Sequence, residues 1–195
     1  MALPVEETSA TPASPGYNVG VKFTLRDFRP EDFEILWRID QKCFVPSVAY
    51  SRVELSTYIR RRGAFTLVAE VLDPAEGPAQ GPPAAANGRP KIIGFIVAEH
   101  ARGGTGHIIS IDVLPADRRS GVGSKLLAAA EEKLRSIACR RIELEAAIDN
   151  TSALAFYKRQ GYDAMKILPR YYSNGVDALV LEKELAPQPA MKVHK

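Results

Sequence analysis

Apolar positions along the chain repeat with two different periods, which separate expected strands from expected helices. Runs rich in β-branched and aromatic residues predict strands at 21–28, 64–72, 91–100, 107–115, 140–147, 162–168 and 177–185. Apolar residues spaced three and four positions apart predict helices at 30–44, 51–61, 121–137 and 151–160. The resulting order is β, α, α, three β, α, β, α, β, β, with the three consecutive strands in a meander. This order predicts an α/β fold with a mixed sheet.

Several expected helices carry recognisable end signals. Ser51, followed three residues later by Glu54, has the pattern of a capping box, and Asn150 precedes the last helix as an N-cap residue. Gly161 follows that helix at the position where a left-handed residue often ends one. The third helix is predicted to have one apolar face, made of Val122, Leu126, Leu127, Ala130, Leu134 and Ile137.

Length and composition favour one domain. The 195 residues are 46% hydrophobic, which is enough for a single well-packed core. We expect the domain to span residues 19–186, between a disordered lead at 1–18 and a flexible tail at 187–195. Segment 73–90 is rich in Gly, Pro and Ala and predicts a long loop inside the domain, because strand-like runs flank it.

Charge and cysteine content exclude several classes of function. The formal net charge is +3 and the basic residues are dispersed, so we expect neither a nucleic-acid nor a membrane partner. Cys43 and Cys139 form no CxxC pair and no His/Cys cluster, so we expect no metal site. The sequence has no apolar run of membrane-spanning length, and its start lacks the features of a signal peptide. We therefore expect a cytoplasmic protein.

A glycine-rich turn lies between the fourth expected strand and the third expected helix. Its Gly-Ser-Lys order differs from a Walker A loop, and Leu126 stands where a dinucleotide fingerprint needs glycine. The pattern Arg118-x-x-Gly121-x-Gly123 leaves backbone N–H groups uncovered at a helix N-terminus, where the helix dipole and the arginine favour a pyrophosphate. The alternative is a glycine-rich turn without a ligand.

Three segments, in order, resemble a known family: IDVLPADRRSGVGSKLL, IELEAAIDNTSALAFYKRQGY and RYYSNGVDALVLEKEL. They resemble the GNAT acetyltransferase superfamily, and within it the ribosomal-protein-alanine and other protein N-terminal acetyltransferases. The resemblance covers roughly residues 20–185. It implies the GNAT fold, which is a mixed and mostly antiparallel sheet with splayed central strands and flanking helices. The periodicity described above predicts about four of these helices. The resemblance also implies that acetyl-CoA lies where the central strands part.

The resemblance implies which residues hold acetyl-CoA, a co-substrate that needs no metal. The pyrophosphate lies on the loop before the third helix, and the backbone of the preceding strand pairs with the pantetheine arm as an added strand would. Asn150 bonds that arm, and its role as a helix cap is equally good and compatible. The implied residues are Ile111, Asp112, Val113, Arg118, Arg119, Ser120, Gly121, Val122, Gly123, Ser124 and Asn150.

Acetyl transfer to an amine needs a neutral nucleophile, a polarised thioester carbonyl and a proton for the departing thiolate. Strand alternation places Glu143 and Glu145 on one face, and either could be plain surface charge. The resemblance selects Glu145 to take the amine's proton, through a water. It also places Tyr157 opposite the CoA sulfur, with packing in the helix core as the alternative. His107 is either a second base or an ordinary strand-end histidine.

The resemblance also implies a protein or peptide N-terminus as the acceptor. Tyr171 and Tyr172 resemble the tyrosines that line a peptide slot, although paired tyrosines also suit the start of a strand. Phe44, Val45 and Tyr50 lie where the family shapes the pocket for the first residue. We therefore predict an acetyl-CoA-dependent N-acetyltransferase that transfers directly in a ternary complex, since no cysteine is placed for an acyl-enzyme.

Two other functions stay open at this point. An acetyltransferase acting on a small amine, such as a polyamine-like compound, would be favoured by an acidic acceptor pocket. A non-catalytic acyl-CoA-binding module would bind CoA and tolerate the loss of Glu145 and Tyr157.

Overall fold

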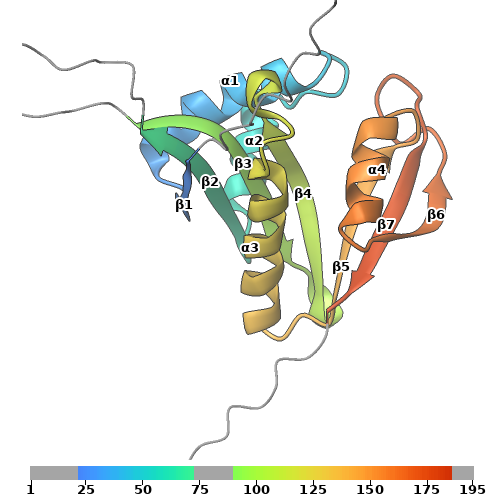
Figure 1. Cartoon of the computed structure of the whole chain (residues 1–195). Coiled ribbons are helices and arrows are strands. Elements are labelled where there is room, and N and C mark those ends of the chain that lie inside the picture. Colours follow the sequence, from blue (N-terminus) through green and yellow to red (C-terminus); the bar gives the residue numbers. More distant parts are fainter. Residues whose placement is uncertain (1–21, 73–89, 186–195) are drawn as a thin grey trace, which may run out of the picture.

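A computed structural model describes residues 22–72 and 90–185 as an open seven-stranded sheet with helices on both faces (Figure 1). The expected lead and tail, and the expected loop except Pro90, lie outside the described residues. The strands are β1 (Thr24–Asp27), β2 (Ala64–Leu72), β3 (Pro90–His100), β4 (Thr105–Val113), β5 (Arg141–Ala147), β6 (Asp163–Leu168) and β7 (Ala178–Glu184). The helices are α1 (Phe33–Cys43), α2 (Arg52–Arg60), α3 (Val122–Ser136) and α4 (Thr151–Arg159). Every expected strand and helix forms, in the expected order.

The sheet has the order β1-β2-β3-β4-β5-β7-β6. All neighbouring strands are antiparallel except β4 and β5, and β2, β3 and β4 form the predicted meander. The parallel pairing of β4 with β5 runs only from Thr105↔Arg141 to His107↔Glu143. Both strands continue beyond these pairs, and Figure 1 shows them diverging. The predicted GNAT fold, with splayed central strands in a mostly antiparallel sheet, is confirmed.

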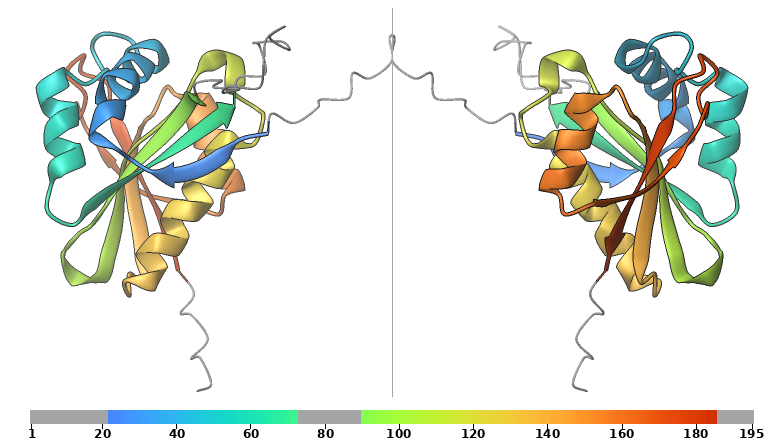
Figure 2. Two further views of the ribbon diagram at one scale, coloured as in Figure 1. Left: turned by 90° about the vertical axis from the view of Figure 1, so that its left-hand side faces the viewer. Right: turned by 90° about the vertical axis from the view of Figure 1, so that its right-hand side faces the viewer.

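Two hydrophobic layers hold the helices to the sheet. Helices α3 and α4 cover one face, and α1 and α2 cover the other (Figure 2). On the first face, the predicted apolar side of α3 is buried at Val122, Leu126, Leu127, Ala130 and Leu134. On the second face, the core is centred on Leu36 of α1, Leu55 of α2 and Phe95 of β3, none of which is exposed to solvent.

The predicted helix ends are confirmed at Ser51, at Gly161 and at Asn150, whose side-chain oxygen accepts the Ala153 N–H, but one residue departs from prediction. The Ser51 hydroxyl accepts the Glu54 N–H (3.2 Å), and the Glu54 carboxylate accepts the Ser51 N–H (2.8 Å). Gly161 follows α4 with a φ of 85°, as a left-handed end requires. Ile137, however, is 47% exposed. The helix has already ended at Ser136, and Ile137 and the left-handed Ala138 begin the turn toward β5.

Two carboxyl groups are buried where α1 packs on β4. Asp112 is 1% exposed, and its Oδ2 accepts the Ser110 hydroxyl (2.6 Å). Asp40 accepts the Tyr50 N–H (2.9 Å) and the Gln41 amide (2.9 Å) through its Oδ2. The Oδ1 atoms of both carboxyls lack a partner among the described residues. Burial raises the pKa of Asp112 to about 7 and that of Asp40 to about 6, because the ionised forms lose their hydration.

The raised pKa of Asp112 predicts a pH-dependent stability. Folding takes up a proton at this carboxyl, so the stabilisation is complete below its ordinary pKa of 3.8 and is lost as the pH rises to about 7. The side chain of Asp112→Asn stays neutral at every pH. The free energy of unfolding of this variant, minus that of the wild type, should therefore increase by up to about 1.4 kcal/mol for each pH unit between pH 5 and 7. Urea titrations at pH 5, 6, 7 and 8 measure this difference.

Asp163→Asn serves as the control, because Asp163 is exposed on β6. The free energy of unfolding of this variant, plotted against pH, should run parallel to that of the wild type. A parallel curve for Asp112→Asn as well would contradict the assignment of a buried, protonated carboxyl.

Candidate active site

The N-terminus of α3 lies at the end of the sheet where β4 and β5 diverge. Its N-cap, Gly121, has a φ of 89°, and no side chain caps the helix, whereas Ser51 caps α2 and Asn150 caps α4. A Cβ on Gly121 would meet no atom within 4 Å, so the left-handed backbone, rather than crowding, accounts for the glycine. The first N–H groups of this 15-residue helix have no side-chain acceptor, which suits a bound anion.

The loop before α3 adds positive charge to this helix end. Arg118 and Arg119 are both exposed, and Arg119 adopts a left-handed φ of 61°. The Arg118 Nε donates to the carbonyl of Val113 at the end of β4 (3.1 Å). No acidic residue occupies the first turn of α3. Two guanidinium groups beside an uncapped helix N-terminus fit a pyrophosphate.

The other predicted loop residues have mainly structural contacts. The Ser120 hydroxyl donates to the Asp117 carbonyl (2.5 Å), and the Ser124 hydroxyl accepts the Gln160 amide (3.3 Å). The side chain of Val122 is buried in the core. Val122 can therefore offer a ligand only its backbone. A Cβ on the half-buried Gly123 would make ordinary contacts, 3.7 Å or more, with Phe156 and Val113.

The end of β4 turns backbone groups toward the diverging side, where they have no partner on β5. The Leu114 N–H donates to the Ile93 carbonyl of β3 (2.9 Å). Since alternate residues of a strand direct their backbone groups to the same side, those of Ile111 and Val113 face away from β3, toward the space that β5 leaves. The Val113 carbonyl is bonded by Arg118 and by the Cys43 thiol (3.3 Å). This edge can pair with an extended ligand.

Glu145 and His107 meet across the divergence. Ile142 and Leu144 of β5 are buried on one face, and Glu145 lies on the opposite face as predicted. Its Oε2 lies 2.8 Å from the His107 Nε2. Burial acts to lower the pKa of His107, but the hydrogen bond and charge of Glu145, together with Glu99, outweigh it and raise that pKa above its ordinary value. The histidine thus contacts the predicted base Glu145 at the end of the β4–β5 pairing.

Tyr157 of α4 is buried, with 7% of its surface exposed. Its ring packs edge-on against Phe156 and Tyr162, with centroid distances of 5.1 and 5.6 Å. Its hydroxyl has no hydrogen-bond partner among the described residues. Burial, followed by the charges of Asp112 and Tyr172, raises the pKa of Tyr157 well above 10, so its hydroxyl stays protonated. Both predicted roles, packing and a free hydroxyl, are compatible with this position.

The three predicted acceptor-side tyrosines lie on two loops. Tyr171 and Tyr172 lie in the turn between β6 and β7, with ring centroids 5.2 Å apart. The alternative role as strand-forming residues is therefore wrong. Tyr50 lies between α1 and α2, stacks near Tyr58 at 5.0 Å and donates its hydroxyl to the Ile109 carbonyl (3.3 Å). Burial raises the pKa of Tyr172 to about 12, with further contributions from Tyr171 and Glu145.

A hydrogen bond joins these two loops. The Ser173 hydroxyl, next to Tyr172, donates to the Ser47 carbonyl in the α1–α2 loop (2.5 Å). Phe44 is half-buried in that loop, whereas Val45 is 60% exposed. The two loops therefore approach each other on the side of the site away from α3, where the acceptor pocket was predicted.

Two contacts of this site were not predicted from the sequence. Cys43 reaches Val113, and burial followed by the charge of Asp112 raises the pKa of its thiol to about 11. Glu99 of β3 faces His107, with 3.7 Å between its Oε1 and the His107 Nδ1. Both contacts join residues more than five positions apart on different elements. No local pattern in the sequence could have indicated them.

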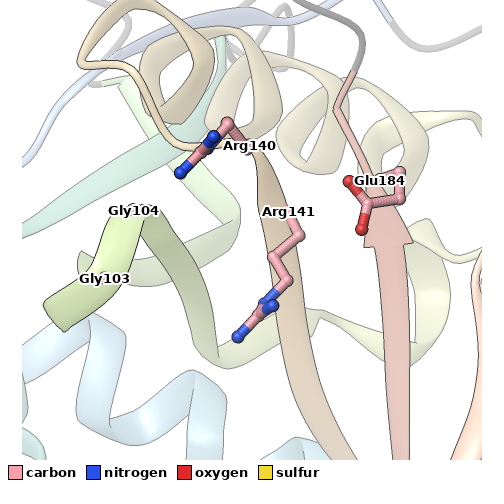
Figure 3. Close-up of a pocket in the computed structure, with 5 residues that line it drawn as sticks. All are labelled: Gly103, Gly104, Arg140, Arg141 and Glu184. Carbon is pink, nitrogen blue, oxygen red and sulfur yellow. The ribbon is translucent and has the colours of Figure 1, made fainter.

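A polar pocket of about 270 Å³ lies at the opposite end of the sheet (Figure 3). It is lined by Gly103, Gly104, Arg140, Arg141 and Glu184, none of which belongs to the predicted site.

Within residues 22–72 and 90–185, no three His, Cys, Asp or Glu side chains are grouped to hold a metal ion. Over the same ranges, no helix is long and apolar enough to cross a bilayer.

Comparison with known proteins identifies relatives in sequence and in structure. The chain is 39% identical over 95 residues to "Uncharacterized N-acetyltransferase MJ1530" of Methanocaldococcus jannaschii, covering 48% of this chain and 60% of that protein. It is 36% identical over 102 residues to "N-alpha-acetyltransferase MAK3" of Arabidopsis thaliana, covering 51% and 53%. The matches thus span about half to three-fifths of these curated relatives.

A solved structure extends the likeness over most of the described chain. The crystal structure of Ard1 from Thermoplasma volcanium superposes with a TM-score of 0.69 at 26% identity, covering 84% of this chain and 98% of that one. Residues 33–162 match the family described as acetyltransferase (GNAT). The match confirms the resemblance to the GNAT acetyltransferase superfamily. The chain belongs to the acetyltransferase (GNAT) family.

Proposed function

We propose that this protein transfers the acetyl group of acetyl-CoA to the N-terminal α-amine of a protein or peptide, by direct attack in a ternary complex. The position of Glu145 carries the proposal. It lies two residues past the last β4–β5 pair, hydrogen-bonded to His107 and close enough to influence the pKa of Tyr171 and Tyr172. A carboxylate there lies between the expected thioester and the acceptor-side loops. The names of relatives, such as N-alpha-acetyltransferase, support this acceptor class.

Acetyl-CoA would lie across the divergence of β4 and β5. Arg118, Arg119 and the N–H groups at the start of α3 would hold its pyrophosphate. The backbone of Ile111 and Val113 would pair with the pantetheine arm. Asn150 caps α4 through its side-chain oxygen, bonded to the Ala153 N–H (3.1 Å), and this leaves its NH₂ group for the same arm.

The choice of an N-terminal amine suits a carboxylate base. An α-amine has a pKa of about 7.7–8.0, against about 10.4 for lysine, so a much larger neutral fraction is present at neutral pH. Glu145 then needs to remove only the proton released as the amide forms, directly or through a water. Tyr171 and Tyr172 would hold the peptide backbone with their hydroxyls and rings. Tyr50, Phe44 and Val45 would border the first side chain.

Tyr157 would stabilise the departing thiolate by hydrogen bonding. A thiol has a pKa of about 8.5, whereas that of tyrosine is about 10 and is raised further here by burial. Complete transfer of the tyrosine proton to the sulfur is therefore uphill. A hydrogen bond that strengthens as charge develops on the sulfur, or a concerted transfer, needs no free tyrosinate.

Direct transfer is favoured because the thiol near the site is a poor nucleophile. Cys43 lies against Val113, and its raised pKa of about 11 leaves almost no thiolate at neutral pH. The Cys43 thiol also donates to the Val113 carbonyl. An acyl-enzyme on Cys43 would require both the thiolate and the loss of this contact.

Thiol release from acetyl-CoA tests the acceptor class. The panel contains peptides with free N-termini, N-blocked peptides containing lysine, and small polyamines. We expect release only with the free N-termini, and about 100-fold less in Tyr157→Phe. Tyr162→Phe is the control, because its hydroxyl bonds Glu131 (3.1 Å) in the core. Release with polyamines alone would contradict the proposal and favour the small-amine function, and CoA binding without any release would favour a binding module.

Glu145→Gln separates catalysis from binding. The amide keeps the shape of the side chain but cannot accept the amine's proton, so we expect kcat to fall about 100-fold while KM for acetyl-CoA changes little. Steady-state kinetics at saturating peptide measure both constants. Glu143→Gln is the matched control, since Glu143 lies on the same face of β5 but pairs with Arg141 (3.3 Å). Equal kcat for the two variants would remove Glu145 from the mechanism.

A further inference from the structure

We propose that Glu99 is a positioning residue for acetyl transfer: its carboxylate orients His107 toward Glu145 and stabilises the imidazolium that forms when Glu145 passes on the acceptor's proton. The inference rests on the proposed function, because it names the group that receives the proton after Glu145. Nothing in the resemblance or the family match assigns a role to Glu99.

The contacts form a row across three adjacent strands. The His107 Nε2 lies 2.8 Å from the Glu145 Oε2 on β5, and its Nδ1 lies 3.7 Å from the Glu99 Oε1 on β3. Glu99 and His107 are directly opposite each other in the antiparallel β3–β4 register. The two ring nitrogens therefore each face a carboxylate from a different neighbouring strand. This arrangement determines which nitrogen points to the site.

Arg61 fixes the outer end of the row. Its guanidinium donates to the same Glu99 Oε1 (3.0 Å) and lies over the Tyr58 ring, 4.8 Å from the centroid. The Glu99 side chain is 12% exposed, whereas that of Arg61 is 44% exposed. Glu99 is thus a largely buried carboxylate with a charged partner. An ionised carboxylate at this position favours a proton on His107.

The charges that face His107 come from three elements. They are Glu99 of β3, Glu145 of β5 and, behind Glu99, Arg61 after α2. Glu143 is opposite His107 in the β4–β5 register, but its carboxylate is paired with Arg141. The two carboxylates outweigh burial and raise the pKa of His107. The imidazolium is therefore a stable form of the ring in this site.

The proton balance of the reaction calls for such a group. When a neutral amine attacks the thioester, an N–C bond forms, the C–S bond breaks, and the nitrogen loses one proton while the thiolate gains one. The nitrogen's proton passes to Glu145 and then to the Nε2 of neutral His107 in the tautomer that carries its hydrogen on Nδ1, the nitrogen that faces Glu99. The imidazolium so formed returns one proton to water, since the His107 side chain is 27% exposed. The departing thiolate takes one proton from water, directly or through Tyr157, so no net proton is released. Glu145 is then ready for the next acceptor.

Glu99 has the role that a buried carboxylate plays behind the histidine of a catalytic triad, where it orients the ring and stabilises its charged form without being protonated. At 3.7 Å the contact is too long for a hydrogen bond, and it becomes an ion pair when His107 is protonated. A ring movement of about 0.8 Å brings the Nδ1–H to hydrogen-bond distance when the ring becomes charged. The contact should therefore shorten in the charged state.

Glu99→Gln tests the role, because it keeps the side chain's shape and removes its charge. Glu99→Asp keeps the charge on a shorter side chain, and Glu143→Gln is the matched control on the other side of His107. Nuclear magnetic resonance titration of the free protein follows the ring of His107, one of three histidines, assigned with His107→Gln. We expect the pKa of His107 to fall by about one unit in Glu99→Gln and to stay near wild type in the other two.

Steady-state kinetics on whichever amine of the panel is acetylated give the second readout. We expect kcat of Glu99→Gln at pH 7 to fall about tenfold while KM stays unchanged. The acid limb of the plot of kcat against pH should move to lower pH. Added imidazole buffer should restore part of the rate. Glu99→Asp should recover most of the activity. A slower variant with neither a shifted limb nor a response to imidazole would reduce Glu99 to a structural residue and overturn the inference.

The two proposals fail in distinguishable ways. Acetylation of a polyamine but of no peptide would refute the proposed acceptor, while the same variants would still test Glu99 on the polyamine. An unchanged pKa of His107 in Glu99→Gln would refute the inference even if peptides are acetylated. Absence of acetylation with every amine would refute both the acceptor and the positioning role of Glu99.

Discussion

The short parallel pairing of β4 with β5 is the constraint on which the rest of this structure depends. After three residue pairs the strands separate, although both continue. Backbone groups in a sheet normally find partners on both sides, and those of Ile111 and Val113 lose theirs on the β5 side. The same separation brings the N-terminus of α3 and the side chain of Glu145 to the two borders of the opening. Stability given up along this edge is available for binding an extended ligand.

Helix ends in this protein show where outside charge is expected. Helices α2 and α4 satisfy their first N–H groups with their own side chains, Ser51 and Asn150. Neither α1 nor the longer α3 has such a cap, but α1 carries Glu34 in its first turn, whereas the first turn of α3 carries no acid. A side chain that capped α3 would occupy the position a phosphate needs. The absence of a cap there, together with Arg118 and Arg119, is a more specific sign of an anion site than the glycines alone.

Local signals predicted the elements of this fold well, and long-range contacts less well. The capping box at Ser51 and the end signal at Gly161 depend on residues within one helical turn, so the sequence indicates them directly. The meeting of His107 with Glu145 depends on which strands become neighbours, and the register that sets Glu99 opposite His107 includes a bulge near Val97. Hydrophobic periodicity carries no information on either. Only the resemblance to a family predicted that the central strands part.

The single hydrogen bond between Ser173 and Ser47 has a consequence for how a chain leaves the protein. Such a bond contributes about 1 kcal/mol, so this contact holds the two loops together only weakly. No disulfide joins them, since the two cysteines are free and lie elsewhere. If a peptide acceptor binds between these loops, as proposed, it can leave sideways without being drawn back along its length. The residence time of such an acceptor would then depend on the contacts that hold its first residues rather than on the total length of the acceptor.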